Sequence, residues 1–380
     1  MKNLLRITRL TVGVLFIFSG LVKANDPAGL SYKMQEFFEA WGFHAPDSVT
    51  LPFSIAMIAF EIMAGVAVIL GWRFRQFAWM LLALIVFFTF LTGYALFSGK
   101  IKACGCFGDC IPLTSGQSFV KDLLLLVMIG FLFLQRDRVR PFLKERTSLI
   151  AFILSGLVSL GLMAYALTRL PPVDCLPYKT GNSIPEKMRI PPGAVPDSTV
   201  INFVYEKDGR QVEFDANNFP PDFNDSTYRF VRRYDKVVRK GNAEPAIKDF
   251  VILTRDGNDT TQAILATEGR ILILFSRSIE GSPVDWSWKR DMDGLREKAK
   301  SAGVPIMWVT SAAARVGAAL QSAGWDDILL MKGDAVAIKT AARTDPTAYI
   351  LRKGVIEGKW SYAELDEAAA ALANPGNGKP

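Results

Sequence analysis

Residues 51–98 read LPFSIAMIAFEIMAGVAVILGWRFRQFAWMLLALIVFFTFLTGYALFS and decide the fold of the first half of the chain. Two apolar runs, Leu51 to Leu70 and Phe74 to Ser98, meet at a junction that carries Arg73 and Arg75. Each run has about the ~20 residues that an α-helix needs to cross the ~30 Å hydrocarbon layer of a membrane. The stretch therefore predicts two membrane-spanning helices joined by a short basic turn.

Three more runs of the same kind flank this pair, at Leu4 to Val22, Phe119 to Leu134 and Ser148 to Leu167. The whole chain has 380 residues, of which 50% are hydrophobic, and this composition is too apolar for one soluble domain. From Pro171 onward, prolines, charges and short apolar runs replace the long apolar segments. We expect a membrane part followed by one soluble domain with its own core.

The orientation follows from the basic residues, because short loops rich in lysine and arginine stay on the cytoplasmic side. Such residues cluster before the first span, between the second and third, and between the fourth and fifth: Lys2, Arg6, Arg9; Arg73, Arg75; Arg136, Arg138, Arg140, Lys144, Arg146. We expect a multi-pass protein of the bacterial inner membrane, with a cytoplasmic amino terminus, a retained first span and a periplasmic carboxy-terminal domain. The net charge of +7 is explained by these loop residues and not by a nucleic-acid-binding face, and membrane lipid is an expected partner.

The four cysteines fall on the same, outer side of this topology. Cys104, Cys106 and Cys110 lie within Cys104-Gly-Cys-Phe-Gly-Asp-Cys110, and Cys175 follows the fifth span. One interpretation is thiol–disulfide exchange, with Cys104 and Cys106 as redox pair or partners and the other two as resolving or structural cysteines. The alternative is two structural disulfides. Four cysteines allow three full pairings. We expect Cys104 or Cys106 to bond Cys110 or Cys175, because a Cys104–Cys106 bridge closes a strained ring.

Polar residues inside the apolar spans are the second candidate site. Glu61 lies in the middle of the second span and should face the bundle interior. It could serve a proton-linked or quinone-linked role, or it could be a polar helix contact. Lys23 lies near the end of the first span and should reach Glu61 only by snorkelling. Asp122 is expected to cap the fourth span or to lie at the interface. No metal site is expected, since His44 is the only histidine and is expected in a solvated loop.

The membrane half resembles a known family. Arg9 to Lys23 looks like the opening span of DoxX-like membrane proteins, and Glu61 to Gly71 looks like their second. With Cys104-Gly-Cys-Phe-Gly108, the pattern is most similar to the MauE branch, named for methylamine utilisation, over about the first 135 residues. The resemblance implies a four-helix membrane unit and a part in forming or transferring disulfides for a periplasmic enzyme. We assign this unit to residues 1–147 and the fifth helix to 148–170.

The soluble half suggests a thioredoxin-like domain over residues 246–373, after a linker and β-containing insertion at 171–245 and before a disordered tail at 374–380. Its expected elements alternate strand and helix and end in a hairpin and a helix: strand 246–254, strand 270–276, helix 287–302, strand 304–310, helix 312–323, strand 327–331, strand 346–351, a strand to Trp360 and helix 362–372. Asp345-Pro346-Thr347 resembles the cis-proline step of thioredoxins. The strand ending at Phe275 is followed by no Cys-X-X-Cys pair, so the domain itself cannot perform dithiol exchange.

The expected architecture is thus an all-α transmembrane helical bundle followed by a periplasmic α/β thioredoxin-like domain. Two functions follow. The chain could be a thiol–disulfide protein that helps to mature envelope proteins, with a periplasmic client and with quinone as a candidate cofactor. Alternatively, it is a non-enzymatic anchor and interaction subunit of an envelope complex, with structural disulfides.

Overall fold

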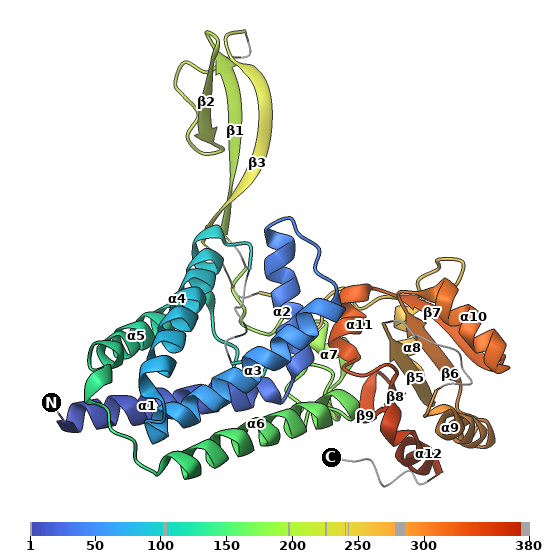
Figure 1. Ribbon diagram of the computed structural model, residues 1–380. Helices are drawn as coiled ribbons and strands as arrows, with labels where there is room; N and C mark the ends of the chain where they lie inside the picture. The colour runs from blue at the N-terminus through green and yellow to red at the C-terminus, as the bar shows by residue number, and fades with distance from the viewer. Residues whose placement is uncertain are drawn as a thin grey trace.

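The computed structural model describes residues 2–101, 105, 107–196, 198–224, 226–239, 241, 243–277 and 286–373. Figure 1 shows a bundle of long helices, an α/β domain beside one end of the bundle, and a β-sheet arm that stands out from both. The fold is therefore the expected helical bundle followed by an α/β domain.

Five helices in the described part of the chain are long and apolar enough to cross a membrane, as predicted. They are α1 (Lys2–Ala24), α3 (Asp47–Leu70), α4 (Phe74–Ser98), α5 (Ser115–Leu134) and α6 (Glu145–Thr168). A 3-10 turn, η1 (Arg136–Arg138), follows α5. The sequence indicated only a loop where α2 (Pro27–Ala40) lies. Asp26 caps α2 by accepting a hydrogen bond from Gly29 N at 3.0 Å, and Pro27 suits its first turn.

Small residues let the membrane helices pack closely. A Cβ on Gly65 of α3 would lie 2.7 Å from the carbonyl oxygen of Gly13 of α1, so these two backbones are in contact. Gly156 of α6 similarly meets Met63 of α3, and Gly93 of α4 meets Phe119 of α5. The bundle therefore contains two groups of packed helices, α1 with α3 and α6, and α4 with α5.

The predicted basic loops lie together at one end of the bundle, which we call the basic end. Arg75 Nε binds Asp137 Oδ1 at 2.5 Å, and Phe142 N donates to Leu70 O at 2.8 Å. The other end, which we call the cysteine end, carries α2, residues 105 and 107–114, and the connection to the α/β domain. The basic loops and the cysteine end therefore lie at opposite ends of the bundle.

The α/β domain contains a six-stranded sheet, within the described residues, with strand order β4-β7-β6-β5-β8-β9. Its strands are β4 (Ile252–Leu253), β5 (Arg270–Ser276), β6 (Ile306–Thr310), β7 (Ile328–Gly333), β8 (Thr347–Arg352) and β9 (Val355–Ser361). Strands β5, β6 and β7 are parallel, whereas β8 runs antiparallel to β5 and pairs with β9. A parallel β5-β6 pair beside an antiparallel β8-β9 hairpin is the expected thioredoxin-like arrangement, and the Asp345–Pro346 bond is cis as predicted.

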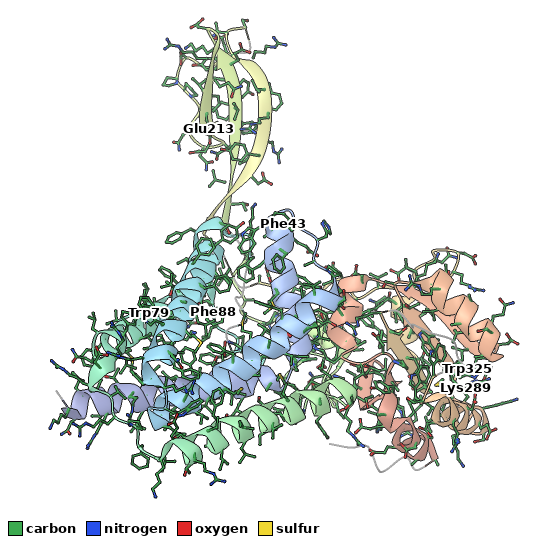
Figure 2. The ribbon with its side chains drawn as sticks, viewed as in Figure 1. Phe43, Trp79, Phe88, Glu213, Lys289 and Trp325 are labelled. Atoms are coloured by element: carbon green, nitrogen blue, oxygen red, sulfur yellow. A yellow bond between two sulfur atoms is a disulfide. The ribbon has the colours of Figure 1, made fainter. Side chains whose placement is uncertain are left out.

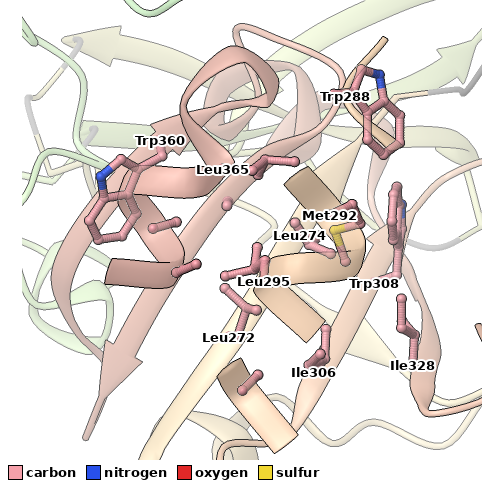
Figure 3. Packing of buried hydrophobic residues seen from close by; sticks show 14 of the residues in the cluster. Leu272, Leu274, Trp288, Met292, Leu295, Ile306, Trp308, Ile328, Trp360 and Leu365 are labelled. Atoms are coloured by element: carbon pink, nitrogen blue, oxygen red, sulfur yellow. The ribbon is translucent and has the colours of Figure 1, made fainter. Parts of the chain in front are cut away.

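Helices cover both faces of this sheet. They are α7 (Ile184–Lys187), α8 (Thr261–Leu265), α9 (Lys289–Ser301), α10 (Ala313–Ala323), α11 (Ala335–Ala341), the 3-10 turn η3 (Tyr362–Glu364) and α12 (Leu365–Ala373). On one face, Leu272 and Leu274 of β5 pack with Met292 and Leu295 of α9 and with Trp308 of β6 (Figure 3). The other face packs against α8 and α11. Burial on both faces explains why β5 is a continuous apolar run.

Three expectations for this half are corrected by the structure. The expected strand at 246–254 shrinks to β4, because Asp249 adopts a left-handed conformation with φ 52°. Helix α11 was not predicted. The segment 171–196, which was expected as a linker, packs on the α/β domain: Tyr178 and Ile184 are 2% and 0% exposed in the second core of the sheet, and Ser183 bridges to Val355.

The β-containing insertion forms the arm in Figure 1. In the described residues it is an antiparallel sheet of order β2-β1-β3, made of β1 (Ser198–Lys207), β2 (Arg210–Asp215) and β3 (Arg229–Arg239). Tyr205 stacks on Phe214 at 5.3 Å and meets Phe223 at 5.1 Å, and further rings extend this cluster. The arm thus carries its own small aromatic core.

Candidate functional site

Cys110 and Cys175 form a disulfide. The prediction that Cys104 or Cys106 would bond Cys110 or Cys175 is therefore wrong, and Cys104 and Cys106 themselves lie outside the described residues. Asn25, just after α1, explains the pairing. It exchanges hydrogen bonds with the backbone of Val173, from Nδ2 to O at 2.8 Å and from N to Oδ1 at 2.9 Å, and its Nδ2 lies 3.8 Å from Cys110 Sγ. It thereby holds the segment leading to Cys175 against Cys110.

The acidic neighbours of this disulfide tie it to the α/β domain. Asp109 binds Arg343 at 3.2 Å, and the same guanidinium binds Asp26 at 2.8 Å. Asp174 binds Lys359 at 3.1 Å. Burial lowers the pKa of Lys359, and the Asp174 carboxylate opposes this shift. These contacts favour a structural role for Cys110 and Cys175, as a clamp between the cysteine end and the α/β domain.

Lys23 and Glu61 form a buried ion pair inside the bundle. Lys23 Nζ lies 2.5 Å from Glu61 Oε1, and Ser19 donates to Glu61 Oε2 at 3.2 Å. The expectation that Lys23 reaches Glu61 only by snorkelling is wrong, because the Lys23 side chain is 5% exposed and pairs directly. Its ammonium also lies 5.1 Å from the ring centre of Phe88, which Figure 2 labels on α4. Helix α2 follows α1 immediately, so Lys23 is enclosed by protein.

Asp122 is also buried in the bundle, at 1% exposure, which corrects its expected role as a cap or interfacial residue. The cap of α5 is Thr114, in a capping box with Gln117. Asp122 lies nearly two turns later. Thr92 of α4 donates to Asp122 Oδ2 at 3.0 Å, and Lys121 Nζ lies 2.7 Å from Oδ1. His44, by contrast, is exposed as expected.

A cavity of about 270 Å³ connects these polar groups with the cysteine loop. Its walls are mostly aromatic and aliphatic, and they come from α1 to α5. Ser19, Lys23 and Glu61 line it from α1 and α3, and Thr92, Lys121 and Asp122 line it from α4 and α5. Gly105 and Phe107, the sequence neighbours of Cys104 and Cys106, also line it. An apolar cavity with a few placed polar groups is the usual form of a small-molecule site.

Arg277 occupies the position after β5 where a redox thioredoxin carries its cysteine pair. Its side chain binds Asp345, beside the cis-proline, at 2.8 Å. It also reaches the membrane unit, donating to Tyr32 of α2 at 2.7 Å and to Asp47 of α3 at 2.8 Å. Burial raises the pKa of Tyr32 to about 12. Burial also raises the pKa of Asp345, against the effect of Arg277. The carboxyl end of β5 is therefore docked on the membrane unit.

Sequence reasoning identified Lys23 and Glu61, but it missed the role of Asp122 and Thr92 and the docking residues Arg277 and Arg343. For Asp122 and Thr92, the available signal was a polar residue within an apolar span. The arginines gave no comparable signal, because charged residues in loops are usually solvated.

These features define a membrane helical unit with a cysteine loop above an internal cavity, followed by a thioredoxin-like domain without a cysteine pair. Comparison with known proteins agrees. Residues 1–135 match the family model of methylamine utilisation protein MauE, which confirms the resemblance for this part of the chain. Residues 199–240, the β-arm, match a domain of unknown function named DUF8463.

A curated relative is similar to part of the chain. Protein TlpB of Flavobacterium psychrophilum is 25% identical over an alignment of 171 residues, which covers 41% of this chain and 43% of that protein. The chain therefore matches less than half the length of this relative. No solved structure matches the chain. The membrane unit is therefore MauE-like.

Proposed function

We propose that this chain is a thiol–disulfide exchange protein of the bacterial inner membrane that helps to mature envelope proteins. In this proposal Cys104 and Cys106 exchange disulfides with a periplasmic client, while Cys110 and Cys175 are the structural clamp. The observation that carries the proposal is the position of Gly105 and Phe107. Both line the cavity that contains Lys23 and Glu61, so the loop with the candidate redox pair borders a buried polar site.

The proposed electron acceptor is a membrane quinone, and the cavity fits this class of molecule. Its walls are largely aromatic, and Phe53 and Phe87 in its lining are 55% and 42% exposed on the outside of the bundle. An apolar molecule could thus enter from the bilayer. Lys23 and Glu61 would bind its polar ring. A bound quinone would accept two electrons and two protons as two thiols become a disulfide, so that two S–H bonds break, one S–S bond forms and two O–H bonds form.

The proposed orientation rests on two observations. The Cys110–Cys175 disulfide lies at the cysteine end, and disulfides persist in oxidising compartments such as the periplasm. The basic residues gather at the opposite end, which is typical of the cytoplasmic side. A phosphatase fused after Pro380 should be active in intact cells. An inactive phosphatase together with an active cytoplasmic reporter at the same position would contradict the orientation.

The exchange proposal can be tested by trapping the client. Single variants Cys104→Ser and Cys106→Ser of the full chain are expressed, and cells are quenched with N-ethylmaleimide. When one cysteine of an exchanging pair is removed, the other should stay in a mixed disulfide with its client. One of the two variants should therefore give a reducible adduct. The matched control is the double variant, which keeps Cys110 and Cys175. Absence of adducts from both single variants, or an equal yield from the double variant, would contradict the proposal.

The second candidate is a non-enzymatic anchor and interaction subunit of an envelope complex. The docking of Arg277 favours this candidate. The end of the thioredoxin-like sheet that could meet a client contacts α2 and α3 instead. This candidate predicts that the Cys104→Ser/Cys106→Ser double variant supports envelope protein maturation as well as the unmodified chain does.

A further inference from the structure

The cavity contains the same set of groups twice. Glu61 of α3 has a hydroxyl donor, Ser19, and an ammonium, Lys23, beside it. Asp122 of α5 has the hydroxyl donor Thr92 and the ammonium of Lys121 beside it. Among the described residues, Glu61 and Asp122 are the two carboxylates that line the cavity, and they come from the two different groups of packed helices.

Neither set is explained by helix packing alone. Both carboxylates are 1% exposed, and charged groups at membrane depth are costly and usually functional. The second oxygen of Asp122, Oδ1, is buried and pairs with Lys121 Nζ at 2.7 Å, although within the described part of the chain it accepts no hydrogen bond of good geometry. A buried carboxylate oxygen at a cavity wall can take up a proton and pass it to a ligand.

We propose that Glu61 and Asp122 are two proton-exchange groups that serve opposite oxygens of one quinone-class ligand in this cavity. The inference rests on the proposed function and extends it to Asp122. A 1,4-quinone carries two oxygens on opposite sides of its ring, and its reduction adds a proton to each. Each carboxylate takes up one proton from a thiol and passes it to a quinone oxygen, while the hydroxyl and ammonium beside it orient it and stabilise the carboxylate that remains. The protons released by the two thiols recharge the two carboxylates, so electrons and protons balance.

The test uses the full chain in lipid nanodiscs, with decylubiquinone as the probe. Three variants are compared with the unmodified protein: Asp122→Asn, which loses the acid; Asp122→Glu, which keeps it; and Asp137→Asn, which removes an exposed carboxylate at the basic end. Binding is followed by quenching of tryptophan fluorescence, since Trp41 lines the cavity. Reduction of decylubiquinone by the pre-reduced chain is measured in a single turnover as a function of pH.

General acid–base groups typically contribute about 100-fold or more to a rate. Asp122→Asn should therefore bind decylubiquinone within about threefold of the unmodified chain but reduce it about 100-fold more slowly, with a flattened pH profile. Asp122→Glu should keep a pH-dependent rate with a profile displaced from that of the unmodified chain, because the carboxyl group is moved, and Asp137→Asn should match the unmodified chain. An unchanged rate and pH profile in Asp122→Asn would overturn this inference alone. If the unmodified chain neither binds nor reduces decylubiquinone, the proposal of a quinone as electron acceptor is refuted as well. If Asp122→Asn does not fold, Asp122→Glu tests the inference instead. The pH profile of its reduction rate must then be shifted from that of the unmodified chain.

Discussion

Replacing Arg277 with methionine should loosen the docking of the α/β domain on the membrane unit. The change keeps an unbranched side chain but removes the guanidinium that binds Asp345, Tyr32 and Asp47. Breaking a fully buried ion pair costs about 3–5 kcal/mol, because the remaining charge stays buried without a partner. The Arg277 side chain is 28% exposed and that of Asp47 is 42% exposed. Water therefore offsets part of this cost, and we expect Arg277→Met to lower the free energy of docking by about 2–3 kcal/mol.

This free energy corresponds to a rise of about 30- to 150-fold in the population of the undocked state. Hydrogen exchange of the backbone amides of α2 measures that population, since Tyr32 lies in the contact. The matched control is Arg290→Met, because Arg290 is exposed on α9. The double-mutant cycle of Arg277→Met with Asp345→Asn should give a coupling of about 1–3 kcal/mol. Unchanged exchange of α2 in Arg277→Met, or a coupling near zero, would refute the docking role of this residue.

Other perturbations have equally definite outcomes. The double variant Cys110→Ser/Cys175→Ser should lose about 2–4 kcal/mol of stability in thermal unfolding but still form client adducts; loss of adducts with intact folding would show that the clamp takes part in exchange. Lys23→Met should cost about 3–5 kcal/mol by leaving Glu61 buried alone, and Lys23→Met/Glu61→Leu should recover much of it in chemical unfolding; equal losses in both would argue against the pair. Burial raises the pKa of Asp345, so the folded chain binds its proton more tightly than the unfolded chain does. The contribution of Asp345 to stability should thus be fully present below pH 3.8 and be lost as the pH rises through the raised pKa, a dependence that chemical unfolding at several pH values should show and that Asp345→Asn should abolish.

The sequence predicted the membrane helices because continuous apolar runs of sufficient length have one stable solution in a bilayer. Helix α2 escaped prediction because its fourteen residues mix apolar and polar types, although Asp26 followed by Pro27 was a usable start signal. The strands β5, β6 and β8 were predicted because burial on both faces leaves an apolar run between turn residues. Tyr178 and Ile184 were missed, because isolated apolar residues among prolines do not indicate which core they join.

The candidate site was only partly predictable for a related reason. Glu61 stands out in an apolar span, so its importance could be inferred from its own segment. Its pairing with Lys23 depends on how α1 and α3 are aligned, which the close contact of Gly13 and Gly65 decides. The Cys110–Cys175 bond likewise depends on Asn25, a contact between segments that local sequence does not encode.

The central claim is that the cysteine loop passes electrons to a ligand in the membrane cavity. The most direct measurement is the thiol content of the fully reduced chain in nanodiscs after addition of decylubiquinone, with each cysteine followed by non-reducing peptide mapping. The account predicts that Cys104 and Cys106 become oxidised and that one quinol forms for each pair of thiols lost, even when Cys110 and Cys175 are replaced by serine. Persistent thiols at Cys104 and Cys106, with no quinol formed, would contradict it.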